Sequence, residues 1–340
     1  MIRICLMNVW IGKFPNTFPL FLKSASINST IDFYIISDQD SLWNIPNVHF
    51  IKMTLKDIKI CFEHELKMRI KLEYPYKLCD YKPIWRMLIM DVLEKYDFWG
   101  HLDLDIILGD IRAFLTDELL SKHDKLFDSG FFGLYRCNEE MNDFYKLSMN
   151  KDNMAYPYKR VFRTNYACYF DEFFGMTILG WKYKDVFRDQ QTEDVIQNFG
   201  WKNFYFTSYI THERFIFQWV EGKLYRFNTN EYGEIIEEEN KFKEYMLVHI
   251  GKRDMKLDII ISDINAIQSF WIYPNNFSAD KPLGPLYDDQ ICKQYADIIH
   301  KQDKMRRINN FKRYGLFDYI PHFIISRKIL KYLKNIMKFY

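Results

Sequence analysis

Apolar runs alternate with stretches suited to helices along the first part of the chain. Short apolar runs at residues 2–9, 32–40 and 47–52 predict strands, and residues 17–26 between the first two suit a helix. This strand, helix, strand order is typical of a parallel sheet that is covered on both faces. The pattern therefore predicts an α/β fold.

Between Ile84 and Tyr96, apolar residues recur at the spacing of one helical face, and Pro83 stands just before them. This predicts an amphipathic helix. Residues 97–110 then predict one strand that becomes acidic at its C-terminal end, where open parallel sheets bind ligands. Further along we expect a strand at 130–135, helices after Glu139 and from Phe170, antiparallel strands within 200–230 and a short strand at 247–250.

Composition is that of a folded protein. The 340 residues are 48% hydrophobic and 27% charged, which excludes a largely disordered chain. The aromatic content of 18% is best interpreted as core packing. Six cysteines lie far apart, without the paired spacing of a zinc knuckle or redox dithiol, so we expect a reduced, cytoplasmic setting. We expect neither a signal peptide nor a membrane span.

Charge is distributed unevenly along the chain. Residues 301–340 hold 11 Lys or Arg against Asp303 and Asp318, a local charge of +9 within a total of +2, so residues 1–300 carry −7. Apolar and basic residues at helical spacing within 324–338 predict a helix that docks on an anionic membrane. Packing of that helix on the body or on a partner is the alternative, and nothing elsewhere in the sequence supports nucleic-acid binding.

The strongest chemical signal is Asp103-Leu104-Asp105, at the end of the predicted strand 97–110. Residues two apart on a strand point the same way, so both carboxylates could bind one hard cation such as Mg²⁺ or Mn²⁺. Asp38 and Asp40 have the same spacing, and chance supplies about one such triplet in a chain of this size. A solvated strand end is therefore the alternative for either pair.

The segments 77–83 and 96–110 resemble a family of bacterial glycosyltransferase-like proteins found among polysaccharide-assembly enzymes. More broadly, a polar Asp/Lys/Arg cluster, a helix and a strand that ends in Asp-x-Asp are similar to the nucleotide-sugar half of GT-A glycosyltransferases. The resemblance covers roughly residues 1–260 and implies a Rossmann-like, three-layer GT-A fold with a mixed, mainly parallel sheet. Residues 261–340 would then form a basic helical extension.

The resemblance also implies roles for particular residues. The metal ligands would be Asp103, Asp105 and His249. The donor would contact Asp38, Asp80, Lys82, Arg86, Gly130 and Lys252. The catalytic carboxylate would be Asp171 or Glu172, which the sequence does not distinguish.

Each assignment has a structural alternative. Asp80 could cap a helix, and Lys82 and Arg86 could lie on its solvated face. Gly130 could serve only a turn, and the 171–172 pair could favour a helix N-terminus. His249 could simply be packed or hydrogen bonded.

Taken together, these features predict a metal-dependent hexosyltransferase that uses a nucleotide-diphosphate donor, UDP-linked by preference. Its acceptor would be a saccharide or a lipid-linked sugar in capsule, O-antigen or lipopolysaccharide synthesis, and the protein would lie in the cytoplasm or peripherally on the inner membrane face. The alternatives are a non-catalytic sugar-binding or membrane scaffold protein and a metal-dependent phosphohydrolase. The sequence leaves open the sugar, acceptor, linkage, stereochemical course and oligomeric state.

Overall fold

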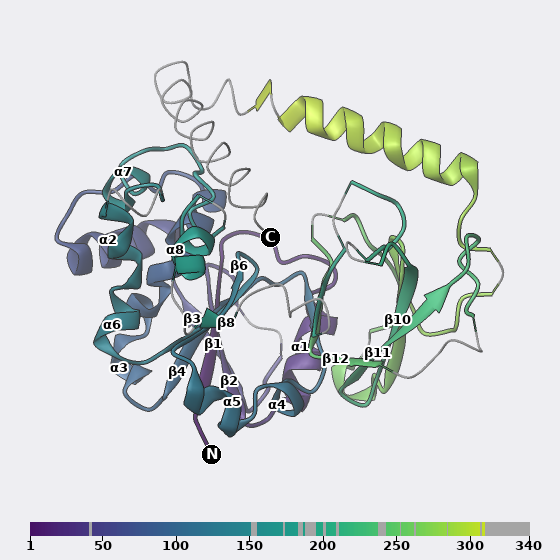
Figure 1. Cartoon of the computed structure of the whole chain (residues 1–340), viewed down its shortest axis with the longest axis horizontal. Coiled ribbons are helices and arrows are strands. Elements are labelled where there is room, and N and C mark those ends of the chain that lie inside the picture. The colour runs from purple at the N-terminus through teal and green to yellow at the C-terminus, as the bar shows by residue number, and fades with distance from the viewer. Residues whose placement is uncertain are drawn as a thin grey trace.

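A mixed seven-stranded sheet forms the centre of the N-terminal part of the chain (Figure 1). The computed structural model describes residues 1–40, 43–150, 155–172, 174–182, 186–187, 195–199, 202–208, 211–236, 243–251, 253–261, 263–283, 285–306 and 308–309. The strand order is β3-β2-β1-β4-β7-β6-β8, and only β7 runs against its neighbours. The strands are β1 (Ile4–Trp10), β2 (Ile31–Ser37), β3 (Val48–Lys52), β4 (Phe98–Leu102), β6 (Lys125–Ser129), β7 (Phe132–Arg136) and β8 (Val186–Phe187). The predicted mixed, mainly parallel sheet is confirmed.

Alternate residues of β1 enter two different cores. Ile4 and Leu6 pack on one face of the sheet with α1, whereas Cys5 and Met7 pack on the other face with α2 and the segment that follows it. The helices on the first face are α1 (Phe18–Ile27), α4 (Ile111–Phe114) and α5 (Asp117–Lys122). Those on the second face are α2 (Leu55–Leu66), α3 (Met90–Leu93), α6 (Glu139–Asn142), α7 (Tyr158–Val161) and α8 (Met176–Lys182), with the 3₁₀ segments η1 (Pro75–Leu88) and η2 (Phe144–Met149). Helices therefore cover both faces of the sheet, as predicted.

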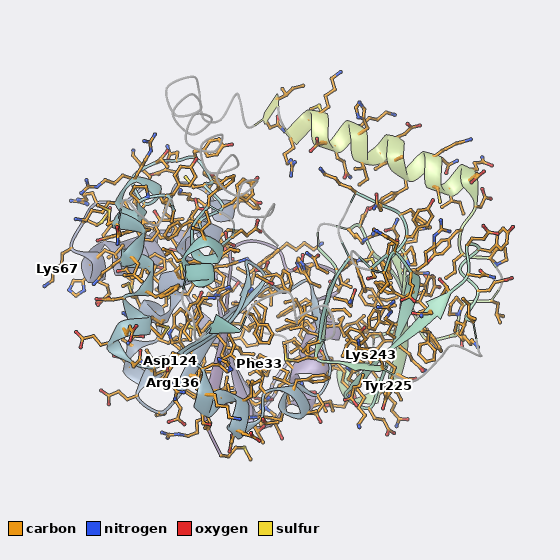
Figure 2. All side chains as sticks on the ribbon, viewed as in Figure 1. Phe33, Lys67, Asp124, Arg136, Tyr225 and Lys243 are labelled. Atoms are coloured by element: carbon orange, nitrogen blue, oxygen red, sulfur yellow. The ribbon has the colours of Figure 1, made fainter. Side chains whose placement is uncertain are left out.

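The edge of the sheet beyond β4 is held by an ion pair between Arg136 and Asp124, which Figure 2 labels. Arg136 also donates to the carbonyl oxygens of Leu120 and His123. One guanidinium thus holds the C-terminal end of β7 against the segment that enters β6, at the end of this strand pair opposite its turn.

Two further sheets complete the body. β5 (Ile106–Leu108), β13 (Leu247–His249) and β9 (Ile196–Asn198) form a three-stranded sheet. A six-stranded sheet contains β10 (Arg214–Val220), β11 (Lys223–Thr229), β12 (Lys243–Tyr245), β14 (Lys256–Asp258), β15 (Ser269–Tyr273) and β16 (Asn276–Ser278). The β10–β11 hairpin confirms the antiparallel strands predicted within 200–230. The expected boundary at residue 260 falls between β14 and β15, two strands of this one sheet.

Two sequence predictions for the segment before the acidic triplet are wrong. Residues 84–96 do not form one amphipathic α-helix, because η1 runs to Leu88 as a 3₁₀ helix and only the short α3 follows. Pro83 lies inside η1 and supplies no amide hydrogen, and polar side chains of η1 are buried as well as apolar ones. The predicted strand 97–110 is likewise two strands, β4 and β5, which belong to different sheets.

A long helix at residues 289–306 follows the last sheet and is drawn in yellow-green in Figure 1. Among the described residues, no helix combines the length and apolar character needed to cross a bilayer. The six cysteines all lie in the described part of the chain, and no disulfide links them. The segment 324–338, which the sequence predicts as a membrane-docking helix, lies outside the described residues.

Candidate active site

Asp103 and Asp105 lie in the break between β4 and β5. The sequence argument that they project from one strand is wrong, because the chain leaves the seven-stranded sheet at Leu102 and enters the three-stranded sheet at Ile106. They nevertheless come together with His249 of β13, and one ligand atom from each of the three lies within 4.8 Å of the others. The break in the strand, rather than strand periodicity, thus brings the acidic pair to the histidine.

Strand pairing places His249 against Asp105. β13 runs antiparallel to β5, with His249 opposite Ile106, and the amide of Ile250 donates to the carbonyl oxygen of Asp105 at 2.8 Å. The imidazole Nε2 lies 3.2 Å from Asp105 Oδ1. On its other side, Nδ1 lies 3.1 Å from Oδ1 of Asn198, and the ring stacks on Phe131 with centroids 4.3 Å apart. Both ring nitrogens therefore have defined partners.

Lys82 connects this cluster to the second acidic segment. Its ammonium lies 2.7 Å from Asp103 Oδ1 and 3.0 Å from Asp171 Oδ2, and it donates to the carbonyl oxygen of Gly130 at 2.6 Å. Lys82 and Asp171 are each only 3% exposed, whereas Asp103 is 30% exposed. The structural alternative for Lys82, a solvated helix face, is wrong, because three oxygen atoms fix its ammonium inside the protein, between the two aspartates.

The site holds more negative than positive charge. Burial lowers the pKa of Lys82, but Asp103 and Asp171 outweigh this effect and hold that pKa well above its usual value. Burial raises the pKa of Asp103, with Asp105 adding to the effect and Lys82 opposing it. Burial raises the pKa of Asp171 well above its usual value in the same way, with Glu172 adding to the effect. The carboxylates thus lie close enough to repel one another, and an additional positive charge would reduce this repulsion.

The pKa of His249 is raised by its acidic neighbours. Burial alone would lower it, but the charge of Asp105, the hydrogen bond with Asp105 and the charge of Asp103 together outweigh burial. In the metal-free protein the ring can therefore be protonated and bonded to Asp105 through Nε2. A metal would need that nitrogen without its proton, so metal and proton compete for one atom.

Asp80 holds the segment that carries Asp171. It is fully buried, and its carboxylate accepts from the Lys77 ammonium at 2.6 Å and from the amides of Cys168 and Phe170 at 2.8 and 2.9 Å. Both oxygens are used within the protein. Asp80 therefore holds the backbone at Cys168 and Phe170 in place, and the donor contact that the resemblance implies stays a prediction.

Gly130 lies against the acidic pair at 171–172. A Cβ atom at this position would lie 2.3 Å from Cγ of Glu172 and 3.1 Å from Oδ2 of Asp171. Real side chains do not tolerate the first distance, so the close approach requires a glycine or a shift of Glu172. The turn at Gly130 therefore brings Lys82, Asp171 and Glu172 close together.

Three further residues expected at the site lie elsewhere or outside the described residues. Asp38 follows β2 at the same sheet edge, where it accepts from the amide of Gly12 at 2.8 Å, a bond that lowers its pKa. Arg86 contacts Met90 and Asn142 and lines a separate cavity that includes no member of the acidic cluster. Lys252 lies outside the described residues.

Sequence reasoning missed two asparagines. Asn8 interrupts the apolar strand β1, is 2% exposed, and donates to the carbonyl oxygen of Leu102 at 2.7 Å, just before Asp103. A polar residue within an apolar strand was the available signal. Asn198 is the parallel register partner of His249, and nothing in the sequence indicates that pairing.

Comparisons with solved structures found glycosyltransferases. An active-site mutant of LgtC has 12% identity and a TM-score of 0.33, with 57% of this chain and 74% of that chain covered. The galactosyltransferase LgtC in complex with donor and acceptor sugar analogues has 13% identity and a TM-score of 0.29, with 57% and 75% covered. The glycosyltransferase GlyE of Streptococcus pneumoniae TIGR4 has 15% identity and a TM-score of 0.31, with 56% of this chain and 46% of that chain covered.

Sequence identities and TM-scores as low as these do not assign an activity to this chain. A search of curated proteins found no match. A family model described as a family of unknown function (DUF6625) matches residues 6–281, and the chain therefore belongs to that family.

Proposed function

We propose that this protein is a metal-dependent glycosyltransferase that uses a nucleotide-sugar donor. The observation that carries the proposal is the convergence of Asp103, Asp105 and His249, joined through Lys82 to Asp171. A cation-binding group and a buried carboxylate thus share one ammonium at one edge of the sheet. This is the arrangement expected where a diphosphate and the reacting sugar lie side by side.

The side chains present fit a divalent cation. Two carboxylates and one imidazole offer oxygen and nitrogen ligands, which suit Mn²⁺ or Mg²⁺. The carboxyl groups of the site, those of Asp103, Asp105, Asp171 and Glu172, outnumber the ammonium group of Lys82, so a divalent cation would reduce their mutual repulsion. A cation bound there would supply positive charge to the leaving nucleoside diphosphate.

Other side chains of the protein would orient the metal ligands and the substrate. Asn198 accepts from Nδ1 of His249 and thereby directs the Nε2 lone pair toward the aspartates. Lys82 fixes Asp103 and Asp171 relative to each other, so that the donor sugar and its diphosphate would be held in one orientation. Asn8 holds the carbonyl oxygen of Leu102, which sets where the chain turns into Asp103.

Asp171 and Glu172 differ in their surroundings, and this difference separates their proposed roles. Asp171 is 3% exposed and paired with Lys82, so it is suited to hold the donor sugar. Glu172 is partly exposed beside Gly130, so it is the better candidate to accept a proton from an attacking hydroxyl. We propose a hexose donor, UDP-linked by preference, and a saccharide or lipid-linked acceptor of a surface polysaccharide.

The test compares Asp103→Asn and Asp105→Asn with Asp40→Asn as the matched control. Asp40 belongs to a triplet of the same spacing but is exposed and paired with Lys52. We expect both site variants to lose Mn²⁺-dependent release of nucleoside diphosphate from UDP-sugars, by about 100-fold or more, while the control keeps it. Unchanged turnover in both site variants would refute the proposal.

The products separate the remaining alternatives. Transfer requires that nucleoside diphosphate release increases with an added sugar acceptor. Release of inorganic phosphate would instead identify a phosphohydrolase. Binding of a nucleotide sugar without any release, by the protein and Mn²⁺ together, would identify a binding or scaffold protein.

A further inference from the structure

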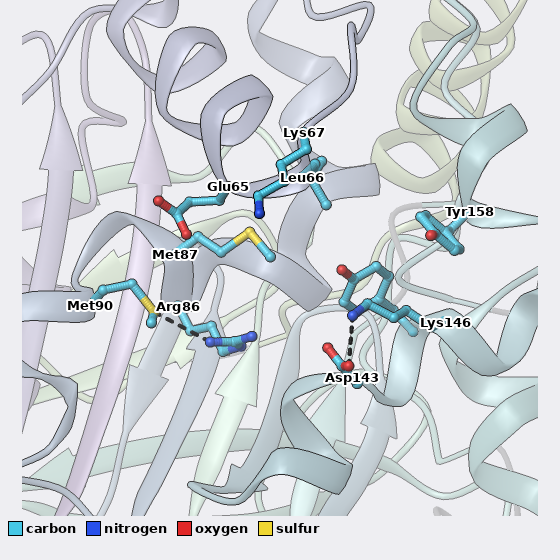
Figure 3. Close-up of a pocket in the computed structure, with 10 residues that line it drawn as sticks. Glu65, Leu66, Lys67, Arg86, Met87, Met90, Asp143, Lys146 and Tyr158 are labelled. Carbon is cyan, nitrogen blue, oxygen red and sulfur yellow. Dashed lines mark hydrogen bonds and ion pairs between the residues drawn. The ribbon is translucent and has the colours of Figure 1, made fainter.

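A second cavity lies on the helical side of η1, apart from the acidic cluster. It measures about 350 Å³ and is lined by residues of α2, η1, α3, η2 and α7 and by residues that flank α2 and η2. Figure 3 shows the residues that line it, among them Leu66, Lys67, Arg86, Met87 and Met90. None of the metal-ligand candidates or their neighbours described above belongs to this set, so the cavity is a distinct feature.

Arg86 is the unusual residue of this cavity. It is only 8% exposed, yet no ion pair with a carboxylate is found for it among the described residues. Its Nη1 contacts the sulfur of Met90 at 3.3 Å and its Nη2 reaches the carbonyl oxygen of Asn142 at a long 3.4 Å, while its Nε has no hydrogen-bond partner in the described structure. Burial of a guanidinium is unfavourable unless anionic or strong polar acceptors compensate it.

A second cation enters the same space. Lys67 ends α2 in the left-handed conformation, with φ of 49°, a position where glycine is usual. Figure 3 shows the side chains of Lys67 and Arg86 entering the cavity from opposite sides of the view. Lys67 is exposed, and Figure 2 shows it at the outer edge of the molecule.

The acidic residues of the cavity are already engaged. Asp143 pairs with Lys146 at 2.6 Å, and Glu65 is hydrogen bonded to Nδ1 of His64 at 2.9 Å. Three basic side chains of the lining (Lys67, Arg86 and Lys146) stand against two acidic ones (Glu65 and Asp143), so the cavity carries an excess of positive charge. Leu66, Met87 and Met90 add an apolar wall, and methionine side chains adapt their shape to what they contact.

We propose that this cavity binds a small organic anion. Its phosphate or carboxylate group lies on the guanidinium of Arg86, whose planar N–H groups match two oxygens of either group. Its apolar part contacts Met87, Met90 and Leu66, and Lys67 closes the solvent side. The site is independent of sugar transfer, and it accounts for a buried arginine that the metal cluster does not use.

The test uses three probes with the same ring: phenyl phosphate, benzoate and benzyl alcohol. Binding to the full chain is followed by NMR of ¹³C-labelled methionine methyl groups, with Met87 and Met90 assigned by substitution. We expect saturable shifts of these two signals with phenyl phosphate or benzoate and none with benzyl alcohol. The better of the two anions identifies the head group. Equal binding of benzyl alcohol, or no binding of either anion, overturns the proposal.

Variants locate the anion. Arg86→Gln should weaken binding about tenfold or more, because the charged hydrogen-bond donor is lost. Lys67→Gln should weaken it by about threefold, while Lys56→Gln, which removes a charge from the same helix α2 outside the cavity, should leave it unchanged. Lys67 is exposed, so its variant stays informative even if Arg86→Gln does not fold.

Asp103→Asn separates this site from the proposed active site. It should bind the anion as the unaltered protein does, whatever it does to turnover. If Lys67→Gln and Lys56→Gln have the same effect, or if Asp103→Asn abolishes the binding, the anion does not lie in this cavity.

Discussion

The Nδ1 atom of His249 lies 3.1 Å from the Oδ1 atom of Asn198, its register partner on the neighbouring parallel strand. Accepting a hydrogen bond from Nδ1–H fixes the tautomer that leaves Nε2 available as a ligand. Asn198→Ala should therefore weaken Mn²⁺ binding by about 10- to 100-fold, as loss of such outer partners does at metal sites.

Calorimetric titration of Mn²⁺ into the metal-free protein measures this effect. Asn198→Asp keeps an acceptor at the same place and serves as the matched control, with binding expected to be at least as strong as in the unaltered protein. If Asn198→Ala binds Mn²⁺ with unaltered affinity, Asn198 does not orient the ring toward a metal.

Metal affinity should depend on pH through His249. Because its pKa is raised above the usual 6.5, the ring stays protonated to higher pH, and metal binding must displace that proton. Mn²⁺ affinity should therefore rise with pH through the raised pKa, by up to about tenfold per unit below it. His249→Gln should bind more weakly and lose most of this dependence.

The contribution of His249 to the stability of the metal-free protein should fall as pH rises, whereas Mn²⁺ affinity rises with pH. A raised pKa in the folded state means that the contribution of His249 is fully present below about pH 6.5 and is lost as pH rises through the folded-state pKa. Thermal unfolding with and without Mn²⁺ on both sides of that window reports both effects. Stabilisation by Mn²⁺ that is equal across the window would show that metal and proton do not compete at this residue.

Asp80→Asn should lower the free energy of unfolding. The substitution leaves the ammonium of Lys77 buried without its carboxylate, which costs about 3–5 kcal/mol where a buried pair is broken. Urea denaturation measures the loss, and Asp91→Asn, an exposed acidic residue of α3, is the control. Full stability combined with lost donor binding would instead support the donor contact that the resemblance implies.

The basic tail should bind anionic membranes if its charge determines the contact. Residues 310–340 carry seven Lys or Arg against Asp318. We expect the full chain to sediment with vesicles that contain phosphatidylserine, and to do so less as salt increases. A chain ending at residue 309 should remain in the supernatant, as should both proteins with neutral vesicles. Equal sedimentation of the two proteins would contradict a membrane role for the tail.

Local patterns in the sequence were sufficient for the first three strands of the central sheet. Apolar runs mark β1, β2 and β3, and the parallel order of β1 and β2 follows from the helix α1 between them. The segment 84–96 could not be predicted in the same way. Its apolar spacing fits an α-helix, but Pro83 and the buried ion pairs of Lys77 and Lys82 favour a tighter 3₁₀ path.

The site could be predicted only in part. The type of a residue indicates what it can bind or catalyse, but it does not indicate which residues lie beside it in the fold. The acidic pair was found from its residue types and its place in the chain and His249 from the resemblance, and the structure brings the three side chains together. The residues that orient these side chains could not be predicted from the sequence. Asn198 meets His249 only through pairing of β9 with β13, and Arg86 lies among different neighbours from Lys82, four residues earlier on the same helix.

The departure of the chain from one sheet into another at Asp103 and Asp105 has a mechanical consequence. Asp103 is linked to the seven-stranded sheet through β4 and to η1 through Lys82, whereas Asp105 and His249 are joined by the pairing of β5 with β13 in the three-stranded sheet. A ligand that contacts all three residues would therefore connect the two sheets, which already share one hydrophobic core. A substitution in that core that alters how the two sheets pack would change the distances among the three side chains, even though it lies away from them.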